Sequence, residues 1–167
     1  DERAFCDDPV ELTLELASRA YLLLAWADYQ DAETGDELHY TADRLHSVCF
    51  CGTYRGNAET KDAFAANKRI DLSRYRGQRN AVVEERITLD RPLARYEIIT
   101  RDVAEFRRQR AAEARTDGDL SSYRVEVAYR GYLPSTYNAA TDNPSDAVQG
   151  VVFNASLAEV TETSATL

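Results

Sequence analysis

The residue types that could carry chemistry are few in this chain, and their spacing does not assemble a recognisable reaction centre. The only histidines, His39 and His46, are seven positions apart, and no third metal ligand accompanies them at a ligand spacing. A catalytic histidine needs a nucleophile and an orienting acid within hydrogen-bond reach. Ser47 and Cys49 are close in sequence, but closeness in sequence does not indicate a triad. Both histidines are therefore interpreted as ordinary surface or packing residues.

The carboxylates also lack a catalytic or metal-binding pattern. Glycoside hydrolysis needs two carboxylates that face each other across a cleft, whereas Glu84 and Glu85 are adjacent on an expected strand and point to opposite faces. The acidic stretch of residues 28–37 contains Gly35, but its spacing does not fit the calcium loop of an EF-hand. No glycine-rich phosphate loop or nucleophile elbow is present. The sequence predicts no catalytic residue, no metal site and no cofactor.

Three cysteines leave the thiol chemistry open. Cys49 and Cys51 flank one residue of an expected strand, so their side chains are predicted on the same face. Cys6 reaches one of them if the N-terminal segment pairs nearby. Buried free thiols and one disulfide are the main alternatives, because cysteine is often simply a small apolar residue and the spacing lacks the four ligands of structural zinc.

One loop combines aromatic rings with amides. Residues 129–150 read YRGYLPSTYNAATDNPSDAVQG. Rings that stack on a sugar and amides that bond its hydroxyls are the usual parts of a carbohydrate platform. The alternative is a structured loop in which asparagine and proline set the backbone turns. The residues of interest for a ligand or partner are Tyr132, Tyr137, Asn138 and Asn143.

Charge is distributed unevenly along the chain, whose net charge is −9. Residues 1–48 contain twelve acids and three bases, whereas residues 68–115 contain thirteen bases and eight acids. Such asymmetry can orient a molecule against a partner. The overall sign argues against nucleic acid, because phosphate binding needs a basic face that the rest of the chain does not repel.

The length of 167 residues fits a single domain spanning 1–167, which is expected to bury about 70% of its unfolded surface. No apolar run reaches the roughly 18 residues that a membrane span requires. The chain begins at Asp1 and contains no methionine, so an export signal, if any, is expected to have been removed. The Thr/Ser-rich end at Leu167 is expected to begin further strands.

Alternation with a period of two is the dominant pattern, and it predicts short strands separated by turns. The expected turn is at Asp31–Glu37, and Tyr123, Val125, Val127 and Tyr129 are expected to face a core. In the strand opened by Pro92, the inward residues are expected to be Ala94, Tyr96 and Ile98. The predicted strands are Leu12–Leu16, Tyr21–Tyr29, Ser47–Tyr54, Arg69–Leu72, Ala81–Leu89, the one from Pro92, Ser122–Tyr132, Val151–Phe153 and the Val160 region.

A single segment departs from the alternation with a period of two. Residues 102–115 are rich in Ala, Arg and Glu, which predicts one helix with Asp102 as N-cap and Glu105 as its capping-box partner. Val103 and Phe106 are expected to anchor it. Many short strands with one helix, and no repeated strand–helix–strand units, predict an all-β fold of the Greek-key β-sandwich type.

Three blocks in the same order give the chain a family resemblance. They are LLAWADY (23–29), the pair GN and DAF (56–57 and 62–64), and LDRPLARYEIITRDVAEF followed by VEVAYRGYLPSTYNAATDNPSDAVQGVVF (89–106 and 125–153). Together they resemble the fimbrillin-like domain of unknown function in surface lipoproteins of Gram-negative anaerobes of the Bacteroidetes type. The resemblance covers roughly residues 20–155. Cys49 and Cys51 are departures from the family pattern, and no lipid-attachment motif precedes Cys6.

The resemblance implies a transthyretin-like or immunoglobulin-like β-sandwich at the cell surface, associated with the outer membrane and often held there by a lipid. It implies a non-enzymatic fimbrial (pilus) subunit, anchor or adhesin, whose partners are other surface subunits joined by strand addition, or a host glycan or protein. The alternative is a carbohydrate-binding β-sandwich module. No catalytic residue is carried over from the family.

Overall fold

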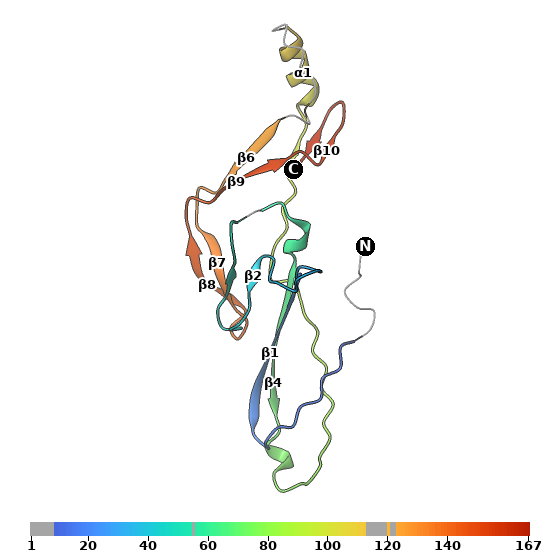
Figure 1. Ribbon diagram of the computed structural model, residues 1–167, viewed down its shortest axis with the longest axis vertical. Helices are drawn as coiled ribbons and strands as arrows, with labels where there is room; N and C mark the ends of the chain where they lie inside the picture. The colour runs from blue at the N-terminus through green and yellow to red at the C-terminus, as the bar shows by residue number, and fades with distance from the viewer. Residues whose placement is uncertain (1–8, 55, 113–119, 121–122) are drawn as a thin grey trace.

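The computed structural model describes residues 9–54, 56–112, 120 and 123–167. Among these residues the chain is elongated and forms small antiparallel sheets and one short α-helix (Figure 1). The mostly-β class predicted from the sequence is therefore confirmed. The sheets follow one another along the molecule, and this arrangement does not by itself establish a Greek-key sandwich.

The longest element is an antiparallel ribbon of β1 (Ala20–Asp28) and β4 (Ala63–Asp71). Its register pairs Ala20 with Asp71 and Asp28 with Ala63. The apolar run of β1 predicted this strand correctly. The following turn is also confirmed, because the Asp31 carboxylate accepts hydrogen bonds from the Glu33 and Thr34 amides, both at 2.9 Å.

The middle of the molecule holds the larger core. β2 (Tyr40–Thr41), β3 (Val48–Phe50), β7 (Leu133–Asn138) and β8 (Asn143–Val148) form one sheet in that order. Buried Tyr40, Val48 and Ala63 pack there against surrounding half-buried side chains. The surrounding side chains are Trp26, Ala42, Leu45, Phe50 and Leu93.

A second, smaller core lies near the helix. α1 (Val103–Ala112) packs through buried Val103 and half-buried Phe106, as the sequence predicted. The Glu105 carboxylate bonds the side chains of Arg108 and Gln109. The neighbouring strands are β5 (Ile99–Thr100), β6 (Arg124–Ala128), β9 (Val152–Ser156), β10 (Glu159–Val160) and β11 (Ala165–Thr166). They form the sheets β6–β9 and β10–β11–β5.

Several predicted strands are shorter than expected. The strand expected over Ser47–Tyr54 pairs only at Val48–Phe50, and Arg69–Leu72 proves to be the end of the longer β4. The expected Ser122–Tyr132 strand is β6, with the predicted alternation of half-buried and exposed residues; Ser122 lies outside the described residues. The 3₁₀ turns η1 (Glu59–Lys61) and η2 (Ser73–Tyr75) flank β4.

Two predicted strands do not form ladders and a third pairs only at its end, in β5, and this is the main correction to the sequence-based prediction. Leu12–Leu16 and Ala81–Leu89 have no strand assignment, although each alternates as a strand should. In the segment opened by Pro92, Tyr96 and Ile98 are 81% and 50% exposed, so they do not point inward. Alternation predicted a strand in each case, but a strand needs a partner with a compatible register.

The chain as a whole exposes an unusually large surface. Its accessible surface is 13410 Å², whereas a compact protein of 18.8 kDa exposes about 8,300 Å². The chain therefore buries only about half of its unfolded surface and not the expected 70% or so. The excess, on the order of 5,000 Å², is as large as an obligate protein–protein interface.

Candidate functional site

The outer edge of β4 is the most distinctive feature of the ribbon. In an antiparallel strand, alternate residues direct their N–H and C=O groups to opposite neighbours. Ala65 directs both groups away from β1, because its amide donates to Asp90 O at 2.9 Å and its carbonyl accepts from Asp90 N at 3.0 Å. Asn67, Arg69 and Asp71 therefore point the same way. Along the described chain, no main-chain partner meets these three residues on that side.

Charge opposes the extension of the Ala65–Asp90 pair into a ladder. Continuing its register would place Arg69 opposite Arg86 and Asp71 opposite Glu84. Like charges directly opposite each other in a sheet are destabilising by up to about 1 kcal/mol. Two such pairs in succession disfavour the ladder, and the segment that precedes Asp90 lies apart from β4.

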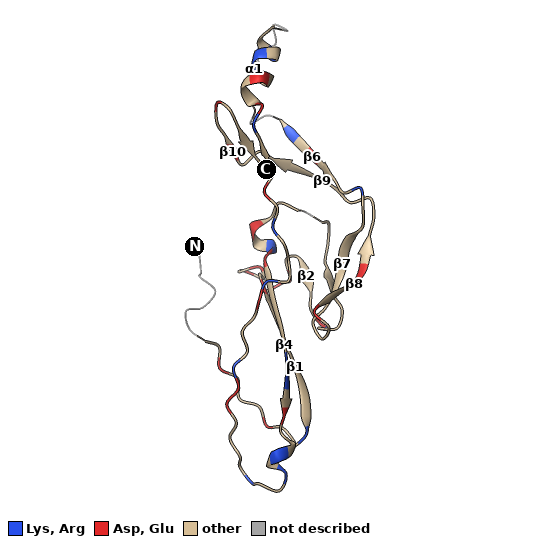
Figure 2. Ribbon diagram, turned by 180° about the vertical axis from the view of Figure 1, so that it is seen from behind, with Lys and Arg blue, Asp and Glu red and all other residues tan. Residues whose placement is uncertain are grey.

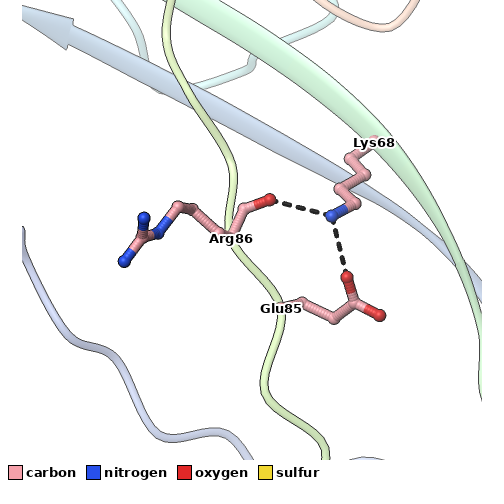
Figure 3. A network of polar contacts seen from close by, with 3 residues as sticks. All are labelled: Lys68, Glu85 and Arg86. Carbon is pink, nitrogen blue, oxygen red and sulfur yellow. Dashed lines mark hydrogen bonds and ion pairs between the residues drawn. The ribbon is translucent and has the colours of Figure 1, made fainter.

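A lysine holds the diverging segment beside β4 (Figure 3). The Lys68 ammonium donates to Glu85 Oε2 at 2.7 Å and to the Arg86 carbonyl at 2.8 Å. The hydrogen bond from Lys68, followed by its positive charge, lowers the pKa of the Glu85 carboxyl. Both side chains are exposed, so the pair contributes little to stability. This contact holds the segment beside β4, while the main-chain groups along the outer β4 edge stay unpaired.

A polar hollow of about 230 Å³ lies at the end of this edge where Ala65 is located. It combines an amide, a guanidinium and two carboxylates, groups that bind hydroxyl-rich ligands. The hollow is smaller than an ordinary ligand pocket of roughly 300–1,000 Å³. Its lining residues are Ala65, Ala66, Asn67, Thr88, Asp90, Arg91, Pro92 and Asp142.

The residues predicted to form a ligand platform do not meet. Tyr132 is 73% exposed and stands before β7, whereas Tyr137, Asn138 and Asn143 are at the opposite end of the β7–β8 hairpin. Five residues of extended strand separate the two tyrosines by roughly 16 Å. Tyr132 and Tyr137 therefore cannot stack on one sugar ring.

The amides at the hairpin turn are engaged in turn structure. Asn138 Oδ1 accepts from the Ala140 amide at 2.9 Å, and Asn143 Nδ2 donates to Thr141 O at 2.6 Å. The Tyr137 hydroxyl donates to the Asp142 carboxylate. Burial, and then this hydrogen bond, raise the pKa of Tyr137. These contacts correspond to the structured-loop alternative.

The two described cysteines are free thiols. Cys49 lies in β3, between Thr41 of β2 and Thr136 of β7 in the register, and is half-buried. The Cys51 thiol is 3.8 Å from the Glu37 carbonyl. Cys6 lies outside the described residues, so the predicted alternative of a disulfide that involves it stays a prediction.

An aromatic row crosses the middle of the molecule, and the sequence analysis missed it. Its rings follow each other at centroid distances of 5.1–5.8 Å in the order Tyr137, Trp26, Tyr40, Phe50, Tyr54 and Phe153. The row joins β7, β1, β2, β3 and β9, so it depends on contacts between distant segments. Ring content alone gave no signal for this order.

Lys61 lies within this row. Its ammonium is 4.5 Å from the ring centroid of Phe50 and 3.2 Å from that of Tyr54, and the Tyr40 hydroxyl donates to its carbonyl at 2.7 Å. Ring faces attract an ammonium ion, but desolvation by burial prevails and lowers the pKa of Lys61 to about 8. Burial in the row is therefore sufficient to shift the pKa of a charged side chain.

The described residues contain neither a metal-binding cluster nor a membrane-crossing helix. No group of three His, Cys, Asp or Glu side chains gathers there in a way that could hold a metal ion. In the same part of the chain, no helix has the length and apolar character needed to cross a membrane.

Comparison with known proteins identifies a family but no characterised relative. No curated protein and no solved structure matches the sequence significantly. A family model described as "Family of unknown function (DUF6562)" matches residues 3–167, which is nearly the whole chain. The chain therefore belongs to this family of unknown function.

Proposed function

We propose that the chain is a non-enzymatic structural or adhesive module of the cell surface, of the fimbrial subunit, anchor or adhesin type, that assembles with other subunits by adding β-strands. The observation that carries this proposal is the open ribbon: β4 has an unfilled edge, and the alternating segments beside it lack ladders. Open edges recruit other strands, and main-chain bonds then supply affinity.

The exposed surface supports the same proposal. An excess of about 5,000 Å² is comparable to obligate interfaces, which bury roughly 2,000–5,000 Å². The strands now unpaired would then complete larger sheets after assembly, and the Greek-key sandwich is proposed for that assembled state. The fimbrillin-like sequence blocks support the surface location and the pilus type of partner.

Size-exclusion chromatography with light scattering tests the assembly proposal. The chain is measured over a concentration series from low to high micromolar. We expect the mass to rise with concentration, because the open edge and its apolar neighbours are covered in the complex. A monomeric mass at every concentration would contradict self-assembly. Surface labelling of intact producing cells tests the location separately, and labelling only after lysis would contradict it.

A carbohydrate-binding module is the second proposal, and the polar hollow beside Asp142 favours it. Its amide, guanidinium and carboxylates could bond sugar hydroxyls, while exposed Tyr132 offers a separate stacking surface. A glycan array with Tyr132→Ala and Tyr137→Ala tests this function. Loss of binding in Tyr132→Ala supports a sugar platform on that exposed ring. Absence of any bound glycan for the unmodified chain would exclude it.

A further inference from the structure

The segment that precedes β1 has the pattern of a strand but no ladder. Its even-numbered residues are large and apolar, and their exposure runs from 87% at Val10 to 48% at Leu16. Its odd-numbered residues are Glu11, Thr13 and Glu15, and no base occurs between Pro9 and Ser18. It is therefore an amphipathic strand, acidic on its polar face, whose apolar face is uncovered.

The unfilled edge of β4 has the complementary character. Between residues 68 and 86 the chain contains six bases and three acids, and Figure 2 shows basic residues at the end of the ribbon that carries η2. Along β4, exposed Asn67, Arg69 and Asp71 alternate with half-buried residues that include Ile70. Leu72 follows on that half-buried face.

One antiparallel register satisfies both faces of the two segments. It sets Glu15 opposite Arg69, which is an attractive pair, and the neutral Thr13 opposite Asp71. It avoids the two like-charge pairs that the Glu84–Thr88 segment would make at this edge. On the half-buried face it sets Leu14 beside Ile70 and Leu12 beside Leu72.

The chain cannot make this pairing with itself. In the stated register, Val10–Leu16 would run parallel to β1, since both strands would be antiparallel to β4. Strands that are parallel in one sheet need a crossover of about a dozen residues or more. Only residues 17–19 separate Leu16 from the start of β1 at Ala20. The donor must therefore come from another copy.

We propose that Val10–Leu16 of one copy pairs as an antiparallel strand with the outer edge of β4 in a second copy. This inference rests on the proposed function and names the segments that perform the assembly. The incoming strand takes the place beside β4 and releases Lys68 from Glu85. Because each copy carries one donor and one acceptor, two copies can exchange donors reciprocally, and a head-to-tail contact can form a ring or a chain of copies.

Two neighbouring substitutions in the full chain test the donor. Leu14→Asn and Thr13→Asn introduce the same side chain at adjacent, unpaired positions, so neither should unfold the isolated chain. Leu14→Asn removes an apolar contact of the proposed interface, and we expect it to raise the dissociation constant for self-association by about tenfold or more. Thr13→Asn keeps a small polar group on the outer face and should change the constant much less. Circular dichroism checks that both variants keep the fold.

A synthetic peptide of residues 9–18 provides the second arm. Added in excess to the full chain, it should occupy the β4 edge and lower the mass measured by light scattering. If the unmodified chain self-associates but the peptide has no effect and the two variants behave alike, the donor assignment is overturned while assembly itself stands. If the unmodified chain is monomeric at all concentrations, the proposed self-assembly and this inference both fail.

Discussion

The aromatic row and the β4 edge are both built from extended segments, yet only the row is closed. In the row, Trp26 from β1 meets rings from β2 and β7, and its neighbour Tyr40 is 3% exposed. At the edge, the segments over residues 10–16 and 81–89 lie without ladders. The difference is the partner: rings from distant segments complete the row, whereas the segment nearest to the edge would place like charges opposite Arg69 and Asp71.

The aromatic row is therefore expected to determine the stability of the monomer, and the β4 edge its assembly. The row holds the monomer together through buried surface and ring contacts, so changes there should act on the free energy of unfolding. The edge contributes little to the monomer because its side chains are exposed. Changes there should act on association, with little effect on folding.

The largest expected effect is the removal of the central ring. Trp26→Ala should lower the free energy of unfolding by about 3–5 kcal/mol, because it deletes a large side chain packed between Tyr40 and Tyr137. Leu12→Ala in the unpaired segment before β1 should change it by less than about 0.5 kcal/mol. Urea unfolding of dilute protein measures both. Equal losses would break the distinction between the two regions.

A glycine beside the row gives the next largest effect. A Cβ on Gly56 would overlap the ring of Phe153, with its Cε2 at 3.0 Å and two ring atoms nearer still. Gly56→Ala should therefore destabilise the chain by about 1–3 kcal/mol through overpacking. Gly131→Ala is a matched control, because nothing lies within 4 Å of its Cβ position. Thermal unfolding compares the two variants, and an unaffected Gly56→Ala would show that this end of the row is loosely packed.

Charge reversal at the edge should have a smaller effect on stability. Arg69→Glu places a carboxylate opposite Arg86 and removes one of the two like-charge pairs, a gain of up to about 1 kcal/mol. The Arg86 and Thr88 amides should then exchange more slowly with solvent, and self-association should weaken because Glu15 meets a like charge. Arg95→Glu is the control away from β4. Unchanged exchange at Arg86 would show that charge does not hold the segment apart.

The smallest expected effect is the pH dependence from Lys61. Its folded-state pKa of about 8 lies below the ordinary value of 10.5, so the unfolded chain holds more protons between these values. Stability should therefore rise with pH across that window, by about 1 kcal/mol or less after solvent screening. Lys61→Met should flatten the change between pH 7.5 and 9.5 in urea titrations. An equal slope in both proteins would assign the change to another group.

Local pattern predicted what depends on local sequence. The apolar run of β1, the turn closed by Asp31, the alternation of β6 and the helix anchored by Val103 and Phe106 are all confirmed. Pairing was harder to predict, because alternation indicates a strand without naming its partner. The like-charge pairs at Arg69 and Asp71 arise only once the Ala65–Asp90 register is known.

For the candidate site too, the sequence showed local composition but not which residues meet in space. The loop composition suggested Tyr132 and Tyr137 as one platform, but the hairpin places them at opposite ends. The β4 edge gave no compositional signal, since Asn67, Arg69 and Asp71 resemble any exposed strand face. The charge asymmetry between the N-terminal part and residues 68–115 was visible in the sequence, and in the proposed assembly it becomes the attraction between donor and edge.

The most direct test of the open edge is hydrogen exchange along β4 at two protein concentrations. The amides of Arg69 and Asp71 point to the unfilled side, opposite Glu15 and Thr13 of the proposed donor, whereas those of Ala66, Lys68 and Ile70 point to β1 and serve as internal controls. We predict fast exchange of the first set in dilute protein, strong protection of it in concentrated protein, and protection of the second set in both. Protection of both sets in dilute, monomeric protein would show that the chain closes this edge itself and would contradict strand addition from a second copy.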